Sequence, residues 1–209
     1  MRKITFSAII FSIFFAGCEL NQSEDNFRYE EKVQTKYDLR LQKDPNYKLN
    51  VNDLNIQQDI DDNSLFCYST AKTTKEKMQK LIEGLRGIPI DCNGGIDTSG
   101  GFSCLLESEL LDTAAKENSL ALASGGASKS LSDRANENGY DAKFLVGGTI
   151  IQNDLSEKAM IEAVEKKMKT DANFCSYVVS KKTKDLGVGY ADSDDSRRYW
   201  TIILGDNGE

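Results

Sequence analysis

The chain has 209 residues, of which 39% are hydrophobic, so it is long enough for one domain with a substantial core and an additional tail. Its formal net charge of −7 argues against binding to nucleic acid, because proteins that bind phosphate backbones need a clustered basic face. The chain contains no histidine, which excludes Ser-His and Cys-His nucleophile pairs and every histidine-ligated metal site.

Residues 1–17 have the pattern of a signal peptide. A short basic region precedes an apolar run over residues 4–15, and the sequence Phe-Ala-Gly-Cys ends at Cys18. This ending resembles a bacterial lipobox, which implies cleavage before Cys18 and lipidation of that cysteine, palmitate included. The alternatives are an ordinary signal peptide or a membrane span, and the apolar run is shorter than the ~20 residues that a span needs. Glu19 is not the Asp associated with inner-membrane retention, so we expect an outer-membrane or cell-surface location.

Residues 18–63 form a polar segment rich in Asn, Asp, Gln and Lys, and its apolar residues follow no sustained period. Such a segment buries too little apolar area to offset the entropy of ordering it. We therefore expect a flexible tether that holds a domain, residues 64–209, away from the membrane.

Besides Cys18, the chain contains Cys67, Cys92, Cys104 and Cys175. An even number of cysteines in an exported chain predicts two disulfides. The absence of a Cys-x-x-Cys spacing argues against a zinc site or a redox motif. Three connectivities are compatible with the spacing.

Capping patterns and apolar periodicity predict the helices. A capping box at residues 73–76 begins a helix that ends before Gly87, and further caps at Ser130 and Ser156 begin two more. Residues 105–123 form the strongest predicted helix. Its expected inward side chains are Leu106, Leu110, Ala114 and Leu122.

A hairpin is expected near the C-terminus, where strand-like runs at residues 186–191 and 199–204 flank an acidic, turn-rich segment. In the first run Gly187 and Gly189 alternate with larger side chains, so one face of the strand is almost bare. This face leaves room for a helix to approach closely. The second run contains Trp200, the only tryptophan, which we expect in the core.

Two further strands are predicted, at residues 144–151 and 174–180. Helices are predicted in the early and middle chain and the clearest strands cluster late. This order predicts an α+β domain in which helices pack on a mostly antiparallel sheet.

Several short motifs occur in an order that covers about residues 73–205. They are Leu81-Ile82 and Arg86, residues 114–123, Asp133-Arg134 with Gly139-Tyr140, residues 164–168, Phe174-Cys175, residues 186–191 and Tyr199-Trp200-Thr201. Together they resemble the CAP superfamily, which comprises the cysteine-rich secretory, antigen five and pathogenesis-related proteins. The resemblance implies a three-layer α-β-α sandwich.

The resemblance also implies a disulfide pairing. Bacterial relatives often carry one cysteine in the loop after the first helix and another after the amphipathic helix, which correspond here to Cys92 and Cys175. This pairing would leave Cys67 to bridge to Cys104.

Three positions depart from the CAP pattern. Many members have a central cleft with two His and two acidic side chains, which in some members hold a divalent metal. At the matching positions this chain has Asn118, Gly148 and Phe174. The resemblance therefore implies a degenerate cleft without catalytic residues, metal or cofactor.

The acidic turn of the hairpin has some of the character of a calcium loop. Asp192, Asp194 and Asp195 supply oxygen atoms, but the segment lacks the full ligand spacing of such a loop. We expect a solvated turn whose charge is neutralised by Arg197 and Arg198.

These features predict a non-catalytic envelope lipoprotein. We expect it to contact the membrane through its N-terminal lipid, to bind a lipid, an envelope component or a host protein, and to be a monomer. The alternative is an envelope hydrolase or peptidase that uses carboxylates such as Glu107, Glu109 or Glu117 in a remodelled cleft.

Overall fold

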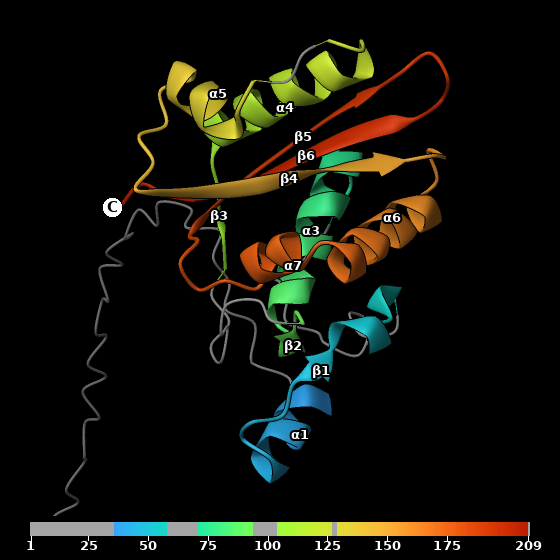
Figure 1. Ribbon diagram of the computed structural model, residues 1–209, viewed down its shortest axis with the longest axis vertical. Helices are drawn as coiled ribbons and strands as arrows, with labels where there is room; N and C mark the ends of the chain where they lie inside the picture. The colour runs from blue at the N-terminus through green and yellow to red at the C-terminus, as the bar shows by residue number, and fades with distance from the viewer. Residues whose placement is uncertain (1–35, 58–70, 94–103, 127–128, 209) are drawn as a thin grey trace, which may run out of the picture.

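The computed structural model describes residues 36–57, 71–93, 104–126 and 129–208. These residues form six α-helices and two small sheets, which confirms the α+β class (Figure 1). The predicted signal peptide and Cys18 lie outside the described residues.

The larger sheet has four strands in the order β3-β5-β6-β4. Their bounds are Leu106–Glu107 for β3, Phe144–Gln152 for β4, Asp185–Asp192 for β5 and Arg198–Asp206 for β6. The predicted hairpin is confirmed as β5 and β6, in which Val188 pairs with Ile202, and β4 pairs with β6 in antiparallel fashion. β3 runs parallel to β5, and β1 (Leu49–Asn50) runs parallel to β2 (Ile90–Asp91). The described strands therefore form a mixed arrangement rather than one mostly antiparallel sheet.

The described helices are α1 (Lys36–Lys43), α3 (Thr74–Arg86), α4 (Glu109–Ala123), α5 (Leu131–Glu137), α6 (Glu157–Thr170) and α7 (Ala172–Val178), with a short 3₁₀ helix, η1 (Val51–Asp53). All of the α-helices except α1 lie against one of the two faces of this sheet (Figure 1). α4 and α5 lie on one side, and α3, α6 and α7 lie on the other. The capping box between Thr73 and Glu76 is present, and Ser130 and Ser156 cap α5 and α6 as predicted.

Helix α4 approaches the sheet at the glycine face of β5. A Cβ atom on Gly189 would lie 2.1 Å from the backbone nitrogen of Lys116, and one on Gly187 would lie 2.4 Å from the carbonyl carbon of Leu111. Real Cβ atoms do not come this close to backbone atoms, so only glycine permits this packing. The prediction that a helix covers the bare face is confirmed.

The opposite face of the sheet is covered by large side chains. Trp200, Phe174 and Met78 are almost completely buried in the main hydrophobic cluster, which confirms the core position expected for Trp200. Val51 and Ile56 belong to the same cluster. The folded core therefore includes residues well before position 64, and the predicted tether boundary at residue 63 is wrong for this segment.

The strand predicted at residues 174–180 is helical instead. Asp171 accepts a hydrogen bond from the backbone nitrogen of Phe174 at 2.9 Å and so caps α7. Phe174, Cys175 and Val178 are buried at helical spacing, with one side of this short helix facing the core. An apolar run of this length is compatible with either structure, and here the cap decides.

The predicted helix over residues 105–123 begins later than expected. Ser108 accepts a hydrogen bond from Leu111 and starts α4, so Leu106 belongs to β3 instead. Leu106 and Leu110, both expected inward, are exposed, whereas Leu111 and Ala115 are buried. This side of α4 approaches β5 closely because the glycine face of the strand has no side chains in the way.

Candidate functional site

The structure brings two of the three predicted cleft positions together and places the third, Asn118, elsewhere. Gly148 lies against Phe174, because a Cβ atom at Gly148 would be 2.7 Å from Phe174 Cδ2. Phe174 is buried among the side chains of the main cluster, whereas Asn118 lies between α4 and the sheet. These residues therefore do not line a common site.

Asn118 belongs to a buried polar group that we call the α4 network, which consists of Asn118, Ser119, Arg134 and Thr201. Asn118 Nδ2 donates to Thr201 Oγ1 at 3.1 Å, and Asn118 Oδ1 accepts from Arg134 Nε at 3.1 Å. The Ser119 hydroxyl lies 2.9 Å from Thr201 Oγ1 and 3.1 Å from the Gly189 carbonyl oxygen. Satisfied networks of this kind fix the packing of a core, so the α4 network joins α4 and α5 to β5 and β6.

A disulfide links Cys92 to Cys175, with their Cα atoms 5.7 Å apart. This confirms the pairing that the CAP resemblance implies, and it ties the segment after β2 to α7. Cys104 is also disulfide-bonded. Cys67, the predicted partner of Cys104, lies outside the described residues.

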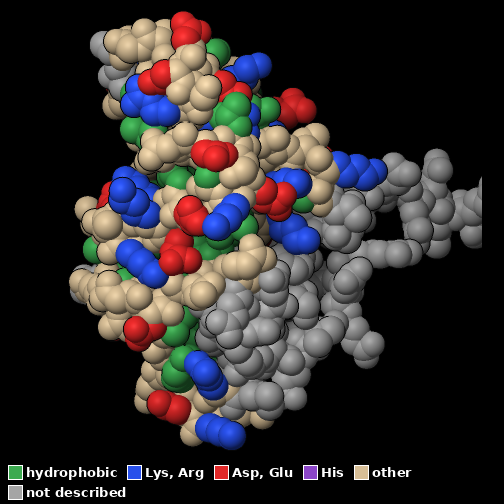
Figure 2. All heavy atoms as spheres, turned by 90° about the vertical axis from the view of Figure 1, so that its right-hand side faces the viewer, with side chains coloured by type: hydrophobic (Ala, Val, Ile, Leu, Met, Phe, Trp, Pro, Cys, Tyr) green, Lys and Arg blue, Asp and Glu red, His purple; other side chains and the backbone are tan. Residues whose placement is uncertain are grey.

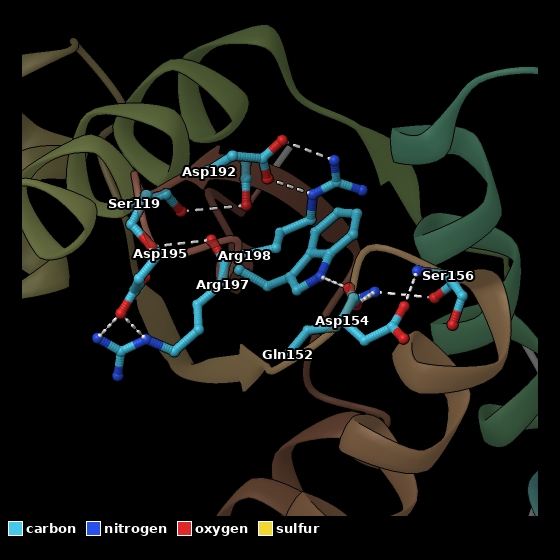
Figure 3. Close-up of polar contacts among 11 residues, drawn as sticks. Ser119, Gln152, Asp154, Ser156, Asp192, Asp195, Arg197 and Arg198 are labelled. Atoms are coloured by element: carbon cyan, nitrogen blue, oxygen red, sulfur yellow. Dashed lines mark hydrogen bonds and ion pairs between the residues drawn. The ribbon is translucent and has the colours of Figure 1, made fainter.

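Ion pairs neutralise the acidic turn of the hairpin, as predicted (Figure 3). Arg198 donates to both carboxylate oxygens of Asp192, at 2.6 and 2.8 Å, and Arg197 Nε donates to Asp195 at 2.7 Å. The hydrogen bond from Arg197 is the main reason that the pKa of Asp195 falls to about 2. These pairs occupy two of the three aspartates that were weighed as calcium ligands.

Two lysines of α6 are likewise paired with acidic side chains. Lys169 lies 2.7 Å from Glu165, and Lys167 lies 2.8 Å from Asp171. On the face shown in Figure 2, positive and negative side chains alternate rather than gather by sign. This face therefore lacks the single-sign field that would attract an anionic polymer.

A different group of polar residues stands out along α3. Lys75, Gln79, Glu83 and Arg86 follow one another at spacings of four, four and three residues, so they lie on one side of the helix. They face Glu107 of β3, Asp112 of α4 and the segment after α7. We call these six residues the α3 seam.

The outer end of the α3 seam is a lysine between two carboxylates. Lys75 Nζ lies 2.5 Å from Glu107 Oε1 and also contacts Asp112 Oδ2. The second oxygen of Asp112 accepts a hydrogen bond from the backbone nitrogen of Val188 at 2.7 Å. The Glu107 side chain is 43% exposed and the Asp112 side chain only 15%, so the two carboxylates differ in their contact with water.

This difference moves the two pKa values in opposite directions. Burial raises the pKa of Asp112 despite the hydrogen bonds from Lys75 and Val188. For Glu107, burial is outweighed by the hydrogen bond and charge of Lys75, and the pKa is lowered. The seam therefore presents two adjacent carboxyl groups of unequal acidity.

The inner end of the α3 seam contains a buried carboxyl group. Glu83 Oε1 accepts a hydrogen bond from the backbone nitrogen of Leu105 at 2.8 Å. Burial raises the pKa of Glu83 to about 7, although the Leu105 hydrogen bond and Arg86 act in the opposite direction. Arg86 Nη1 donates to the carbonyl oxygens of Val178 and Ser180, each at 2.9 Å, and so holds the segment after α7.

Two donors of the α3 seam lack partners. Among the described residues, Gln79 Nε2 and Arg86 Nε are the buried side-chain nitrogen and oxygen atoms that make no hydrogen bond. Gln79 is only 2% exposed, and its amide lies close enough to Glu107 to help lower that pKa without forming a hydrogen bond of good geometry. A buried donor without a partner costs about 1–3 kcal/mol, so a bound polar group would be stabilised there.

Of the three carboxylates considered for catalysis, Glu107 lies beside another carboxylate, that of Asp112. Glu109 and Glu117 are exposed, and Glu117 approaches Arg134 Nη1 at 4.0 Å. Asp112 and the polar residues of α3 were not predicted as site residues, because charged residues on a capped helix usually form a solvated face. One signal of their burial is present in the sequence. Gln79 and Glu83 directly follow the apolar residues Met78 and Ile82, which face the core.

Two further properties concern the described part of the chain. None of its groups of His, Cys, Asp and Glu brings three such side chains close enough to hold a metal ion. None of its helices combines the length and apolar character needed to span a membrane.

The chain matches no known family model, and no curated protein or solved structure shows significant similarity to it.

Proposed function

We propose that the chain is a bacterial envelope lipoprotein that presents a CAP-like domain and binds a ligand or partner without catalysis. In this proposal Cys18 carries the lipid, and the domain is a three-layer α-β-α sandwich around a mixed sheet. The ligand is a lipid, an envelope component or a host molecule. The helices on both sides of the sheet and the Cys92–Cys175 disulfide support the family assignment.

The α3 seam carries the binding proposal. It combines an exposed outer end, at Lys75 and Glu107, with an unpartnered buried donor at Gln79. A ligand hydroxyl or carbonyl oxygen at this place would accept a hydrogen bond from Gln79 Nε2, and a hydroxyl would also donate to Glu107. Small numbers of convergent polar groups of this kind fix the orientation of a ligand.

Native mass spectrometry tests this proposal. The full chain would be purified in detergent from bacterial envelopes, as the wild type and as the variants Gln79→Leu and Gln42→Leu. Gln42 is exposed on α1 and serves as the control. We expect a bound small molecule on the wild type and the control, with occupancy reduced about tenfold in Gln79→Leu, since one lost hydrogen bond of ~1.4 kcal/mol corresponds to this factor. An adduct that Gln79→Leu leaves unchanged, or no adduct on any of the three proteins, would contradict the proposal.

Lipidation is tested separately. Replacing Cys18 by Ala removes the proposed attachment point of the lipid, so the protein should move from the membrane fraction to the soluble fraction after cell lysis. The mass of the N-terminal peptide should carry the acyl chains in the wild type alone. An unmodified N-terminal peptide in the wild type would be evidence against the lipoprotein assignment.

A carboxylate-dependent hydrolase is the second candidate function. The observation that favours it is the pair formed by Asp112, whose pKa is raised, and Glu107, whose pKa is lowered, on either side of Lys75. Pairs with separated pKa values can act as acid and base. Turnover of cell-wall material that is lost in Asp112→Asn would establish this function, and absence of turnover in the wild type would exclude it for that substrate.

A further inference from the structure

The two edges of the four-stranded sheet differ. β3 forms one edge and is two residues long, whereas β4 forms the other and is nine residues long. A very short edge strand offers few free backbone groups to another chain. A long edge strand exposes a row of N–H and C=O groups at alternate residues and is able to pair with a further strand.

Within the β4 strand itself, three features that often prevent such pairing are missing. Its sequence, FLVGGTIIQ, contains no charged residue and no proline, and its register with β6 is continuous over all nine residues without a bulge. Residues 144–149 are all partly exposed, whereas β5 and β6 are almost entirely buried. Ile151 is 52% exposed at the far end of the strand.

We infer that β4 pairs in antiparallel fashion with β4 of a second copy of the chain, which departs from the monomer expected from the sequence. A two-fold axis at Gly148, the middle residue of β4, places the two Gly148 residues opposite each other. In this register Leu145 lies opposite Ile151 of the second copy on the same face of the sheet. The exposed Ile151 side chain then gains an apolar neighbour at both ends of the interface.

The charges that flank β4 fit the same register. Lys143 precedes the strand and Asp154 follows it, and both are exposed. The two-fold axis brings Lys143 of one copy near Asp154 of the other, and symmetry repeats this pair at the opposite end. Between these ends no charged residue faces another, so the interface contains opposite charges at its rim and none at its centre.

Sedimentation velocity of the full chain in detergent, over a range of protein concentrations, measures the association. We expect a concentration-dependent dimer. Ile151→Lys should raise its dissociation constant by about tenfold or more, because the two-fold axis repeats the contact between residues 151 and 145, and both copies of this contact are lost. The matched control is Leu120→Lys, since Leu120 lies on α4 away from the β4 edge and is also 52% exposed. The control should dimerise like the wild type.

The register has its own test. Carbodiimide cross-linking of a mixture of ¹⁴N- and ¹⁵N-labelled protein should yield a peptide that joins Lys143 of one copy to Asp154 of the other. A monomer at every concentration, or a dimer that Ile151→Lys and Leu120→Lys affect equally, would overturn the inference. A dimer without the Lys143 to Asp154 cross-link would overturn the proposed register.

Discussion

The α4 network and the α3 seam are both polar groups at a helix that packs on the sheet, but their hydrogen bonding differs. In the α4 network, Asn118 has partners for its amide nitrogen and its amide oxygen. In the α3 seam, Gln79 Nε2 and Arg86 Nε have none, and Glu83 is a buried carboxyl group with a pKa of about 7. Full satisfaction is the property of a structural network, and unused hydrogen-bonding capacity is the property of a site that can accept a ligand.

The comparison also explains why Asn118, Gly148 and Phe174 do not form a common site. Asn118 has been absorbed into the α4 network, and Phe174 fills the space beside Gly148. Both positions therefore serve packing. Among the described residues, the buried side-chain donors without a hydrogen-bond partner lie elsewhere, along α3.

The largest expected effect lies where α4 meets the sheet. Gly189→Ala should destabilise the domain by about 3 kcal/mol or more, the upper end of the cost of overpacking, because the added methyl group meets backbone atoms of Lys116 that cannot move independently. Urea denaturation would measure the loss. Gly125→Ala is the control, since Gly125 has open space but a φ of 70°, and its cost should be only about 1–2 kcal/mol. Equal losses at both positions would contradict the close packing of α4.

The next effect is a pH dependence that originates in the α3 seam. The pKa of Glu83 is raised from 4.5 to about 7 in the folded state, so the folded protein binds more protons than the unfolded chain between these values. The contribution of Glu83 to the free energy of unfolding should therefore be greatest below pH ~4.5. It should fall by roughly 3 kcal/mol as the pH rises through 7.

Denaturation at several pH values would measure this slope. Glu83→Gln should remove the decline between pH ~4.5 and 7, because the amide does not titrate, whereas the exposed Glu162→Gln should leave it unchanged. The free energy of unfolding of the wild type would then be compared with that of Glu83→Gln at each pH. If this difference does not fall as the pH rises from ~4.5 to 7, Glu83 is not held in its neutral form.

A smaller loss is expected in the α4 network. Asn118→Leu leaves Arg134 Nε without its acceptor and removes one of the two hydrogen bonds at Thr201 Oγ1, which should cost about 2 kcal/mol. The free energy of unfolding from urea titration would show it. Asn136→Leu is a suitable control on the exposed side of α5, where the change should stay within about 0.5 kcal/mol. A loss for Asn118→Leu no larger than that of the control would remove the distinction between the two polar groups.

The smallest expected change in stability belongs to Gln79. Gln79→Leu removes a donor that has no partner, so the folded state should keep its stability or gain up to about 1 kcal/mol. Thermal unfolding of the ligand-free protein would measure this. Marked destabilisation would indicate that the amide already serves the fold.

The sequence predicts the elements that have strong local signals. The capping box at Thr73 and the glycine alternation of β5 are confirmed, because each contains the physical reason for the structure in a few adjacent residues. The signal fails for α7, where an apolar run of ambiguous period becomes helical through the cap at Asp171.

The α3 seam was not predictable in the same way. Its members on α3 meet Glu107 and Asp112 only after folding, and the burial of Glu83 depends on the position of Leu105. No local pattern distinguishes such residues from a solvated helix face. The core position of Val51 and Ile56 was missed for a related reason, since isolated apolar residues in a polar segment carry no period.

The central claim, that the α3 seam and not the α4 network binds the ligand, is tested most directly by nuclear magnetic resonance of side-chain amides. The ¹⁵N-labelled full chain in detergent would be titrated with an extract of bacterial envelope. We predict that the Gln79 side-chain amide and the backbone amide of Leu105 shift, while the Asn118 side-chain amide does not. Shifts confined to Asn118 and its neighbours, or no shifts at either place, would contradict the claim.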